Sequence, residues 1–404
     1  MSAVAEPAMD VATGDRLARR NAMVLAVTQA LAGGNNTVLV ATAGIVGTAL
    51  APDKSLATLP ISIFVLGLWT GTLPIGALAR RFGRRTALQI GTASGALAGL
   101  ICCAAVLQGS FLLFCIGAVF NGFYAAAHNS YRFAAADTAS DAFRAKAISW
   151  VLLGGVLAGV VGAQLVIGTK DLWPLFAATF VGQSVIAVIS AGVLTLLNIP
   201  RPPLHSAAGA GRPLSEIARQ PRFIVAVACG VAAYSMMNMV MTSAPLAMVM
   251  CNHSVTEATL GLQWHVIGMY APSFITGTLI ARFGVERIAG LGLALIIGAA
   301  AIGFAGISLW HFWIALTLLG VGWNFALIGA TTMVTTCHRP HERNRVQAFN
   351  DFLIFGSMAI SSFSSGALLT TFGWATVNEV VFPVTLTAAA LLIWGTVRGR
   401  ERAA

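Results

Sequence analysis

Two pairs of residues that can bind metal ions stand four positions apart in neighbouring apolar stretches. Met237 and Met241 lie in the segment 234–251, which holds six of the chain's twelve methionines, and His265 and Met269 follow in the next run. Residues four apart share one face of a helix, so each pair would present two ligands to the same side. Thioethers suit Cu(I), imidazole suits several transition metals, and the carboxylates that favour Mg²⁺, Ca²⁺ or Mn²⁺ are absent beside these four. The spacing therefore predicts a site for a soft metal ion.

Packing is the alternative interpretation of the same residues. Methionine is flexible and fills irregular gaps in protein cores, so a Met pair at helical spacing is often core. A histidine inside a membrane span is costly and points instead to function. Cys229 and Cys251 flank the methionine segment, roughly 30 Å apart on a continuous helix. They are either stations on a metal route or inert buried thiols, and both interpretations stay open.

The composition shows which elements must position these residues. The chain has 404 residues, of which 57% are hydrophobic and 9% charged, and its mean hydropathy is +0.82. Soluble domains carry about 25% charged residues, so this is an integral membrane protein. Apolar runs of spanning length predict an all-α membrane protein. Twelve transmembrane helices are expected, at about 22–50, 57–79, 86–108, 110–135, 146–168, 173–197, 222–250, 257–281, 287–308, 311–336, 347–370 and 375–397.

Basic residues set the orientation of these spans. All Lys and Arg except Lys54 and Lys170 fall on one side of the membrane if both termini are cytoplasmic, which satisfies the positive-inside rule. The net charge of +10 is thus explained by loop clusters, and nucleic-acid binding is excluded. We expect a multi-pass protein of the bacterial inner membrane, with the lipid bilayer around it. Its predicted parts are a cytoplasmic tail (1–20), a six-helix half (21–198), a cytoplasmic linker (199–221), a second six-helix half (222–398) and a short tail (399–404).

An internal repeat relates the two halves. The stretch 76–85, "GALARRFGRR", aligns with 277–286, "GTLIARFGVE", and each follows the second span of its half. Two parallel six-helix repeats are the layout of the major facilitator superfamily, and the first stretch resembles that superfamily's loop motif. Arg80 stands where the motif has Asp, so the role of that Asp is not transferred. Arg81 and Arg282, which match each other in the repeat, are candidates for gating.

The paired motifs of the second half carry a closer resemblance. M-x-x-x-M followed by H-x-x-x-M, in a chain of this type and length, resembles the CcoA-type copper importers of bacteria. The resemblance implies that Met237, Met241, His265 and Met269 are copper ligands and that Cys229 and Cys251 lie on the copper route. It implies import of copper for cbb3-type cytochrome c oxidase assembly, with copper as cargo, no cofactor, a monomeric protein, and delivery to a cytoplasmic copper chaperone or copper ATPase.

Polar residues inside other spans are candidates for a cavity or a gate. We expect Asp351 to form a charge pair with Arg343 and Arg345 at the inner gate, since all three stand in one short stretch. His128 is expected to bond between helices or to relay protons. Asn129 and Asn324 are predicted to line a cavity or to join helices.

The sequence excludes enzyme classes and leaves two alternatives to copper import. It contains no G-x-S-x-G, no Walker A motif and no carboxylate pair suited to acid and base catalysis. Secondary transport by alternating access is therefore predicted. One alternative is an organic-substrate carrier, such as a riboflavin importer, which would not need the Met and His pairs. The other is an assembly factor that transports nothing.

Overall fold

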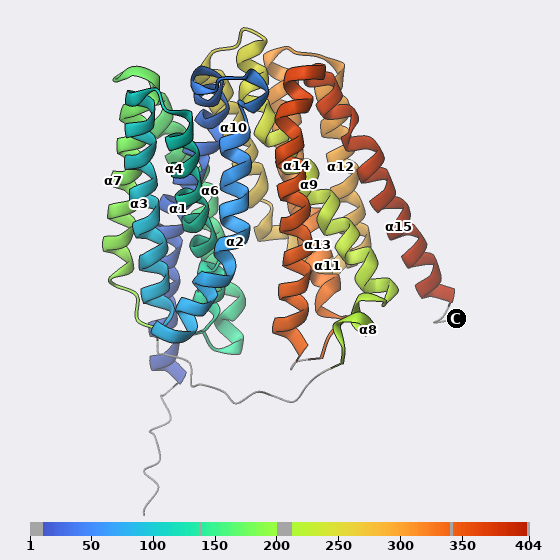
Figure 1. Cartoon of the computed structure of the whole chain (residues 1–404). Helices are drawn as coiled ribbons and strands as arrows, with labels where there is room; N and C mark the ends of the chain where they lie inside the picture. The colour runs from blue at the N-terminus through green and yellow to red at the C-terminus, as the bar shows by residue number, and fades with distance from the viewer. Residues whose placement is uncertain (1–10, 138, 200–211, 340–341, 402–404) are drawn as a thin grey trace, which may run out of the picture.

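The fold is a bundle of long helices. A computed structural model describes residues 11–137, 139–199, 212–339 and 342–401, and the regular elements of these residues are all helical (Figure 1). The helices are α1 (Val11–Leu50), α2 (Leu59–Phe82), α3 (Arg84–Gln108), α4 (Phe111–His128), α5 (Tyr131–Asp137), α6 (Asp141–Thr169), α7 (Ala177–Leu194), α8 (Leu214–Ala218), α9 (Pro221–Met250), α10 (Val255–Tyr270), α11 (Ser273–Phe283), α12 (Val285–Ala305), α13 (Leu309–Thr335), α14 (Arg343–Glu379) and α15 (Val381–Glu401), with 3-10 turns η1 (Lys54–Leu56) and η2 (Pro174–Phe176).

The number of membrane spans agrees with the sequence. Ten candidate spans lie in the described residues, or eleven when α10 and α11, bent by 42° at a short break, count as one. The candidate Arg345–Val397 has 53 residues, which as one helix would be about 80 Å long, far more than a bilayer core. It contains both α14 and α15, which run in opposite directions after a kink at Gly373 (Figure 1). The prediction of an all-α protein with twelve membrane helices is confirmed.

The twelve spans form two bundles that stand side by side, α1–α7 and α9–α15 (Figure 1). We call the end where α1 begins and α15 ends the linker side, and the opposite end the far side. Residues 200–211 of the predicted linker, 1–10 of the first tail and 402–404 of the last lie outside the described residues. The first helix begins at Val11, inside the predicted tail, and α8 forms within the predicted linker.

The two halves repeat each other in backbone conformation. Gly83 ends α2 with φ 91° and ψ 158°, and Gly284 ends α11 with φ 89° and ψ 151°. Positive φ is a conformation that glycine alone adopts readily, which explains why both repeats carry it there. The preceding pairs also match, since Arg81 lies over the ring of Phe82 at 5.1 Å and Arg282 over Phe283 at 5.3 Å.

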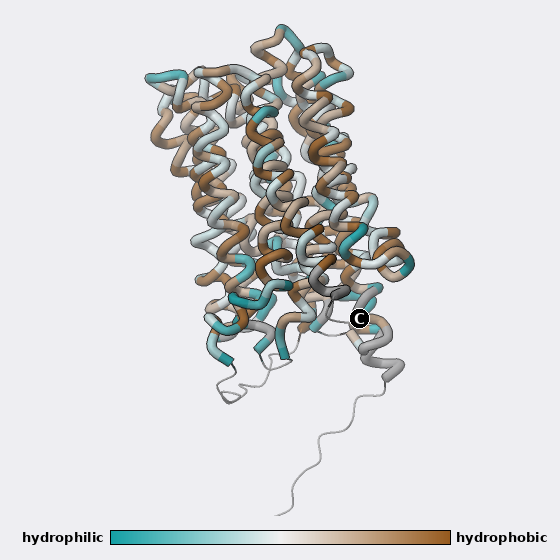
Figure 2. The backbone as a smooth tube through the Cα atoms, turned by 90° about the vertical axis from the view of Figure 1, so that its right-hand side faces the viewer, coloured by the Kyte–Doolittle hydropathy of each residue, from teal (hydrophilic) through white to brown (hydrophobic). Residues whose placement is uncertain are grey.

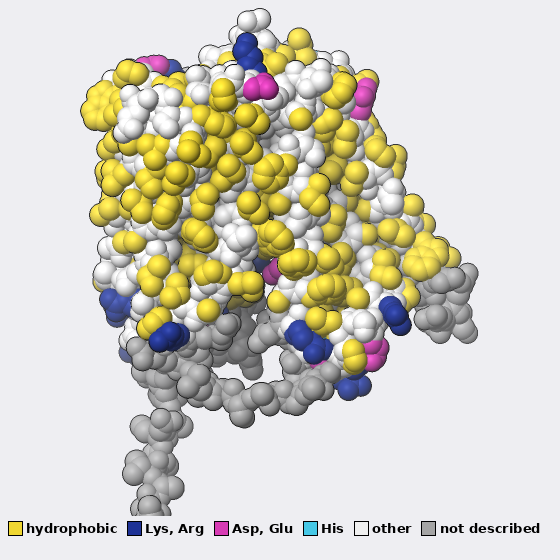
Figure 3. Space-filling view, in the orientation of Figure 1, with side chains coloured by type: hydrophobic (Ala, Val, Ile, Leu, Met, Phe, Trp, Pro, Cys, Tyr) yellow, Lys and Arg dark blue, Asp and Glu magenta, His cyan; other side chains and the backbone are white. Residues whose placement is uncertain are grey.

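Helix packing relies on small residues, and the outer surface is suited to lipid. An ideal Cβ on Gly320 of α13 would lie 2.4 Å from the carbonyl oxygen of His265, so α13 and α10 approach too closely for any larger residue. Figure 2 shows hydrophobic segments along the middle of the bundle and hydrophilic ones at its ends. In Figure 3 Lys and Arg gather near the linker side, below a broad hydrophobic belt.

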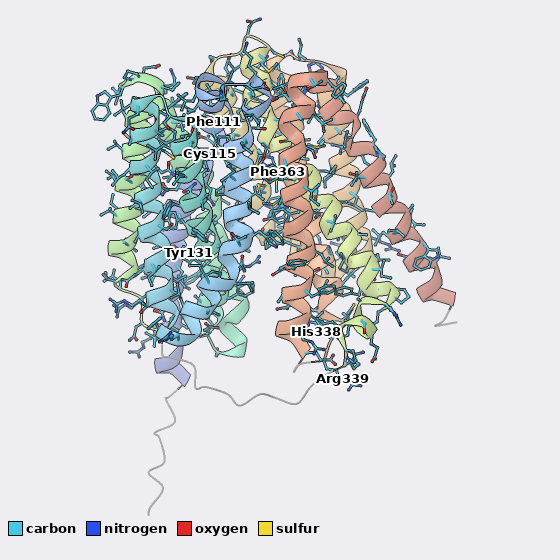
Figure 4. The ribbon with its side chains drawn as sticks, viewed as in Figure 1. Phe111, Cys115, Tyr131, His338, Arg339 and Phe363 are labelled. Carbon is cyan, nitrogen blue, oxygen red and sulfur yellow. The ribbon has the colours of Figure 1, made fainter. Side chains whose placement is uncertain are left out.

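A buried ion pair fixes the end of the linker on the second half. Arg212 binds both carboxylate oxygens of Glu342, with Nε–Oε1 at 3.0 Å and Nη2–Oε2 at 2.7 Å. The backbone N–H of Arg339 also donates to this carboxylate, at 2.9 Å. The side chain of Glu342 has no exposed surface. Its pKa is held well below the usual range, chiefly by the Arg212 guanidinium. Figure 4 shows Arg339 and His338 in this loop, at the linker side of the second half.

Candidate substrate cavity

A cavity of about 350 Å³ lies between the two halves. It reaches from the middle of the bundle to Thr335 at the end of α13 and Gln347 near the start of α14, so it extends toward the linker side. Figure 3 shows a hollow between the halves, below the middle of the face that it draws. Its lining comes from both halves: Gln29, His128, Asn129, Arg132, Phe133, Val151 and Leu152 in the first, and Tyr234, Met269, Tyr270, Ser273, Trp323, Asn324, Leu327, Ile328, Thr331, Thr335, Gln347, Asn350, Asp351, Ile354 and Phe355 in the second.

The two halves are in contact at the far side. Ser62 of α2 and Ser362 of α14 share a hydrogen bond at 3.2 Å. One turn further out, a Cβ on Gly366 would lie 1.7 Å from the hydroxyl oxygen of Thr58, so α14 and α2 touch there. On the opposite face of the bundle, Gln164 of α6 donates to Gln263 of α10 at 3.0 Å. These contacts close the far side, which leaves the cavity accessible from the linker side.

Four aromatic side chains of the second half form one wall of the cavity, which we call the aromatic wall: Tyr234, Tyr270, Trp323 and Phe355. Tyr234 packs edge to face on Trp323, with ring centroids 5.3 Å apart, and on Phe355 at 5.5 Å. Tyr270 packs on Trp323 at 6.3 Å. Each ring therefore holds its neighbour in place. Such a rigid wall can accept a flat aromatic ligand by stacking or edge contact.

Asn324 holds open the break between α10 and α11, beside the aromatic wall. Its Nδ2 donates to the carbonyl of Met269 at 2.7 Å and to the hydroxyl of Ser273 at 2.7 Å. The hydroxyl of Thr276 donates to its Oδ1 at 2.7 Å. The break leaves backbone groups without helical partners inside the membrane, and Asn324 supplies one of the missing bonds. It joins helices as well as lining the cavity.

His128 connects two helices of the first half at the cavity surface. Its Nε2 lies 3.2 Å from Nε2 of Gln29, and its Nδ1 lies 3.2 Å from the carbonyl of Ala125. With the Gln29 amide as donor, the ring is neutral and its Nδ1–H donates to the carbonyl. Its ring also packs edge to face on Tyr131, which Figure 4 labels in the first half. Asn129, the next residue, ends α4 and lines the cavity.

Charge is scarce in the cavity. Among its lining residues Asp351 is the one acid and Arg132 the one base besides histidine. The two come from opposite halves and attract each other, but no ion pair joins them in the described residues. Asp351 accepts from Asn350 Nδ2 at 3.2 Å, and Arg132 lies over the ring of Phe133 at 4.8 Å. Asp351 was predicted to pair with Arg343 and Arg345 at the inner gate. In the structure Arg345 donates instead to the carbonyl of Arg212, and the side chain of Arg343 lies outside the described residues.

The predicted metal ligands are divided between cavity and core. Met269 alone among the four lines the cavity. Met237 is buried in the core of the second half, and Met241 packs where the cores of the halves meet. His265 is fully buried, and its Nδ1 lies 2.8 Å from the carbonyl of Leu316. In the described residues no group of three or more His, Cys, Asp or Glu is arranged to hold a metal ion.

The remaining candidates lie away from the cavity. Cys229 is buried in the core of the second half, and Cys251 is half-buried at the end of α9. Arg81 and Arg282 are exposed at the linker side, each over its neighbouring phenylalanine ring. The aromatic wall is absent from the predictions made from the sequence. All four tyrosines fall inside the predicted spans, although Tyr is enriched at membrane interfaces, so tyrosine content indicated polar rings inside the bundle without distinguishing Tyr234 and Tyr270 from Tyr124 and Tyr131.

Comparison with known proteins establishes the family. The profile of the Major Facilitator Superfamily matches residues 25–263, and the chain belongs to this superfamily of membrane transporters. It is 50% identical to the riboflavin transporter RfnT of Brucella anthropi. The alignment extends over 371 residues, which are 91% of this chain and 93% of that protein. It is 31% identical to the uncharacterized transporter YddS of Bacillus subtilis, over 89% of this chain and 87% of that one.

Solved structures support the same fold. A D-xylose–proton symporter superposes with a TM-score of 0.72 at 15% identity, covering 92% of this chain and 96% of that chain. A bacterial homolog of the human lysosomal transporter Spinster, in an inward-facing, unoccupied conformation, gives a TM-score of 0.65 at 17% identity over 94% and 95%. At these identities the likeness concerns the fold alone.

The prediction of a copper importer is wrong. A relative that is 50% identical over nearly the whole chain is a riboflavin transporter, which contradicts copper as the cargo and favours the organic-substrate alternative. The predicted supply of cytochrome oxidase and delivery to a copper chaperone or copper ATPase lose their basis. The physical reason is that four-residue spacing identifies a helix face without showing what that face contacts. The face with Met237 packs into the core.

Proposed function

We propose that this protein carries riboflavin into the bacterial cytoplasm across the inner membrane by alternating access. The observation that carries the proposal is the 50% identity to a riboflavin transporter over 91% of the chain. The cavity supports it, because riboflavin combines a flat aromatic ring system with a chain of hydroxyl groups. The aromatic wall suits the ring system, and polar side chains from both halves suit the hydroxyl chain.

The distribution of charge supports the proposed orientation. Lys and Arg gather at the linker side, which is the cytoplasmic side under the positive-inside rule. The cavity then faces the cytoplasm, and the contacts between α2 and α14 close the periplasmic side. Uptake requires the reverse state as well, in which these contacts separate and the two halves approach each other at the linker side. Both halves of the cavity belong to one chain, so a monomer suffices.

Growth and uptake test the proposal. A bacterial strain unable to synthesise or import riboflavin should grow on micromolar riboflavin when it expresses this protein, and labelled riboflavin should accumulate in its cells. A variant with Gly366→Ala, in which the periplasmic contact is overpacked, should be present in the membrane but import poorly. Absence of growth and of uptake, with the wild-type protein at normal abundance, would reject the proposal and favour an assembly factor that transports nothing.

A further inference from the structure

Two hydrogen-bond acceptors stand unused on α14 at the cavity. Asn350 is 5% exposed, and its Oδ1 has no partner among the described residues. Its Nδ2 donates to Oδ1 of Asp351 at 3.2 Å, and the second carboxylate oxygen of Asp351 accepts no hydrogen bond in this part of the chain. Both residues line the cavity. A buried acceptor without a partner is costly, so Oδ1 of Asn350 calls for a donor that arrives from elsewhere, and the half-buried Asp351 has a free oxygen beside it.

The aromatic wall contains a hydrogen-bond donor without a partner. Trp323 is 7% exposed, and its indole Nε1–H finds no acceptor among the described residues. This nitrogen can only donate. Residues of the cavity lining thus hold one unpaired buried donor, in the aromatic wall, and two unpaired acceptors, on α14. A ligand that pairs with all of these groups must carry a hydrogen-bond acceptor on its flat part, for Trp323, and hydrogen-bond donors on another part, for the acceptors on α14.

Arg132 forms no hydrogen bond with the free acceptors of Asn350 and Asp351 in the described residues. It lies across the cavity on the first half and attracts the Asp351 carboxylate. Its guanidinium lies over the ring of Phe133, and no ion pair with Asp351 forms in the described residues. An ionised carboxylate accepts hydrogen bonds at two oxygens, and the second oxygen of Asp351 stays available.

We infer that Asn350 and Asp351 bind the hydroxyl chain of the cargo, while Trp323 donates to an acceptor on its ring system. This inference rests on the proposed function and specifies which part of riboflavin each element recognises. Adjacent hydroxyls of the chain donate to the amide oxygen of Asn350 and to the free carboxylate oxygen of Asp351. Charge-assisted bonds of this kind discriminate strongly, because a ligand that lacks the hydroxyls leaves the acceptors unpaired.

Competition with a truncated ligand tests this assignment. Lumiflavin has the ring system of riboflavin and a methyl group in place of the hydroxyl chain. Unlabelled riboflavin and lumiflavin would compete against labelled riboflavin uptake in cells expressing wild type, Asp351→Asn, Asn350→Ala or Ser364→Ala. Ser364 is the matched control, because it lies on the same helix, is exposed, and bonds only the carbonyl of Ile360 in its own helix.

In the wild type we expect riboflavin to compete at least tenfold better than lumiflavin. A lost hydrogen bond to a charged group reduces affinity roughly 10- to 150-fold, so Asp351→Asn should weaken competition by riboflavin by at least tenfold and leave that by lumiflavin unchanged. Asn350→Ala should act in the same direction, and Ser364→Ala should match the wild type. Equal competition by the two ligands in the wild type overturns the inference even if a variant fails to accumulate. A wild type that takes up no riboflavin rejects the proposed function instead.

Discussion

The side-chain amide of Asn324 on α13 donates to the backbone carbonyl of Met269 on α10 at 2.7 Å, where the helix breaks before α11. The same side chain bonds Ser273 and Thr276 beyond the break. Pro272, which has no backbone N–H, stands at the bend of 42°, and Asn324 bonds the helical segments on both sides of it. Tyr270, which follows Met269, is the last residue of α10 before this bend and belongs to the aromatic wall.

Replacing Asn324 should loosen the break. Asn324→Ala takes the side-chain donor from the Met269 carbonyl, while the Thr276 hydroxyl keeps the carbonyl of Pro272 as its acceptor. A buried unsatisfied group costs about 1–3 kcal/mol. We expect a lower melting temperature in detergent and weaker riboflavin binding by the purified protein. Thr332→Val on the same helix is the control, since that hydroxyl bonds only the carbonyl of Ile328. Equal melting temperatures for both variants would contradict the role of Asn324.

Replacing Trp323 should weaken ligand binding. An edge contact between aromatic rings contributes about 0.5–1.5 kcal/mol, and the hydrogen bond of the indole N–H contributes about as much. Trp323→Ala should therefore raise the dissociation constant of riboflavin by roughly five- to 150-fold. Trp323→Phe keeps a ring but loses the indole N–H, and an intermediate loss is expected. Quenching of riboflavin fluorescence on binding measures both. Trp310→Ala is the control, because Trp310 is 66% exposed outside the cavity. An unchanged affinity in Trp323→Ala would exclude the aromatic wall as the binding surface.

Overpacking at Gly366 should disfavour the state described here. A methyl group at this position meets the Thr58 hydroxyl at 1.7 Å, and overpacking typically costs about 1–3 kcal/mol. Gly366→Ala should therefore reduce riboflavin uptake, and adding Thr58→Ala, which removes the hydroxyl, should restore part of it. Gly356→Ala on the same helix is the control, since a Cβ there meets nothing within 4 Å. Equal uptake by Gly366→Ala and Gly356→Ala would show that this contact does not govern transport.

The Arg212–Glu342 ion pair predicts a pH dependence of stability. The pKa of Glu342 is lowered in the folded protein, so the pair stabilises the fold above the ordinary carboxyl pKa of about 4.3. That contribution is lost as the pH falls through the ordinary value toward the lowered one. Melting temperatures should therefore be compared from pH 6 down to about pH 2.5, and those of Glu342→Gln should start lower and fall less steeply than those of the wild type. Glu216→Gln removes a weaker, exposed contact of Arg212 and should follow the wild type. Parallel curves for all three proteins would contradict this role of the pair.

The fold followed from the sequence because its determinants are local. Apolar runs of spanning length and clusters of basic residues are visible without knowledge of neighbours, and the repeat of Gly83 and Gly284 marks equivalent turns in both halves. The break predicted between the last two spans, at residues 371–374, contains the kink at Gly373, but α14 continues past it to Glu379 before α15 begins at Val381.

The site was predicted only in part, because it depends on which helix faces meet. His128, Asn129, Asn324, Asp351 and Met269 line the cavity as polar or soft residues inside spans. Met237 and His265 each begin a pair of residues at ligand spacing. Met237 nevertheless packs into the core of the second half, and His265 bonds the Leu316 carbonyl. Four-residue spacing cannot distinguish these faces. The aromatic wall joins residues from four helices that are far apart in the sequence, so only the folded chain brings it together.

Transport of riboflavin by the purified protein is the most direct test of the central claim. Liposomes containing the protein and loaded with unlabelled riboflavin would be diluted into labelled riboflavin, and exchange would be measured against liposomes without protein and against Trp323→Ala. The account predicts accumulation of label with the wild type, suppression by external riboflavin, and a reduced rate for Trp323→Ala at a subsaturating label concentration. Label that enters no faster with the wild type than in empty liposomes would contradict it.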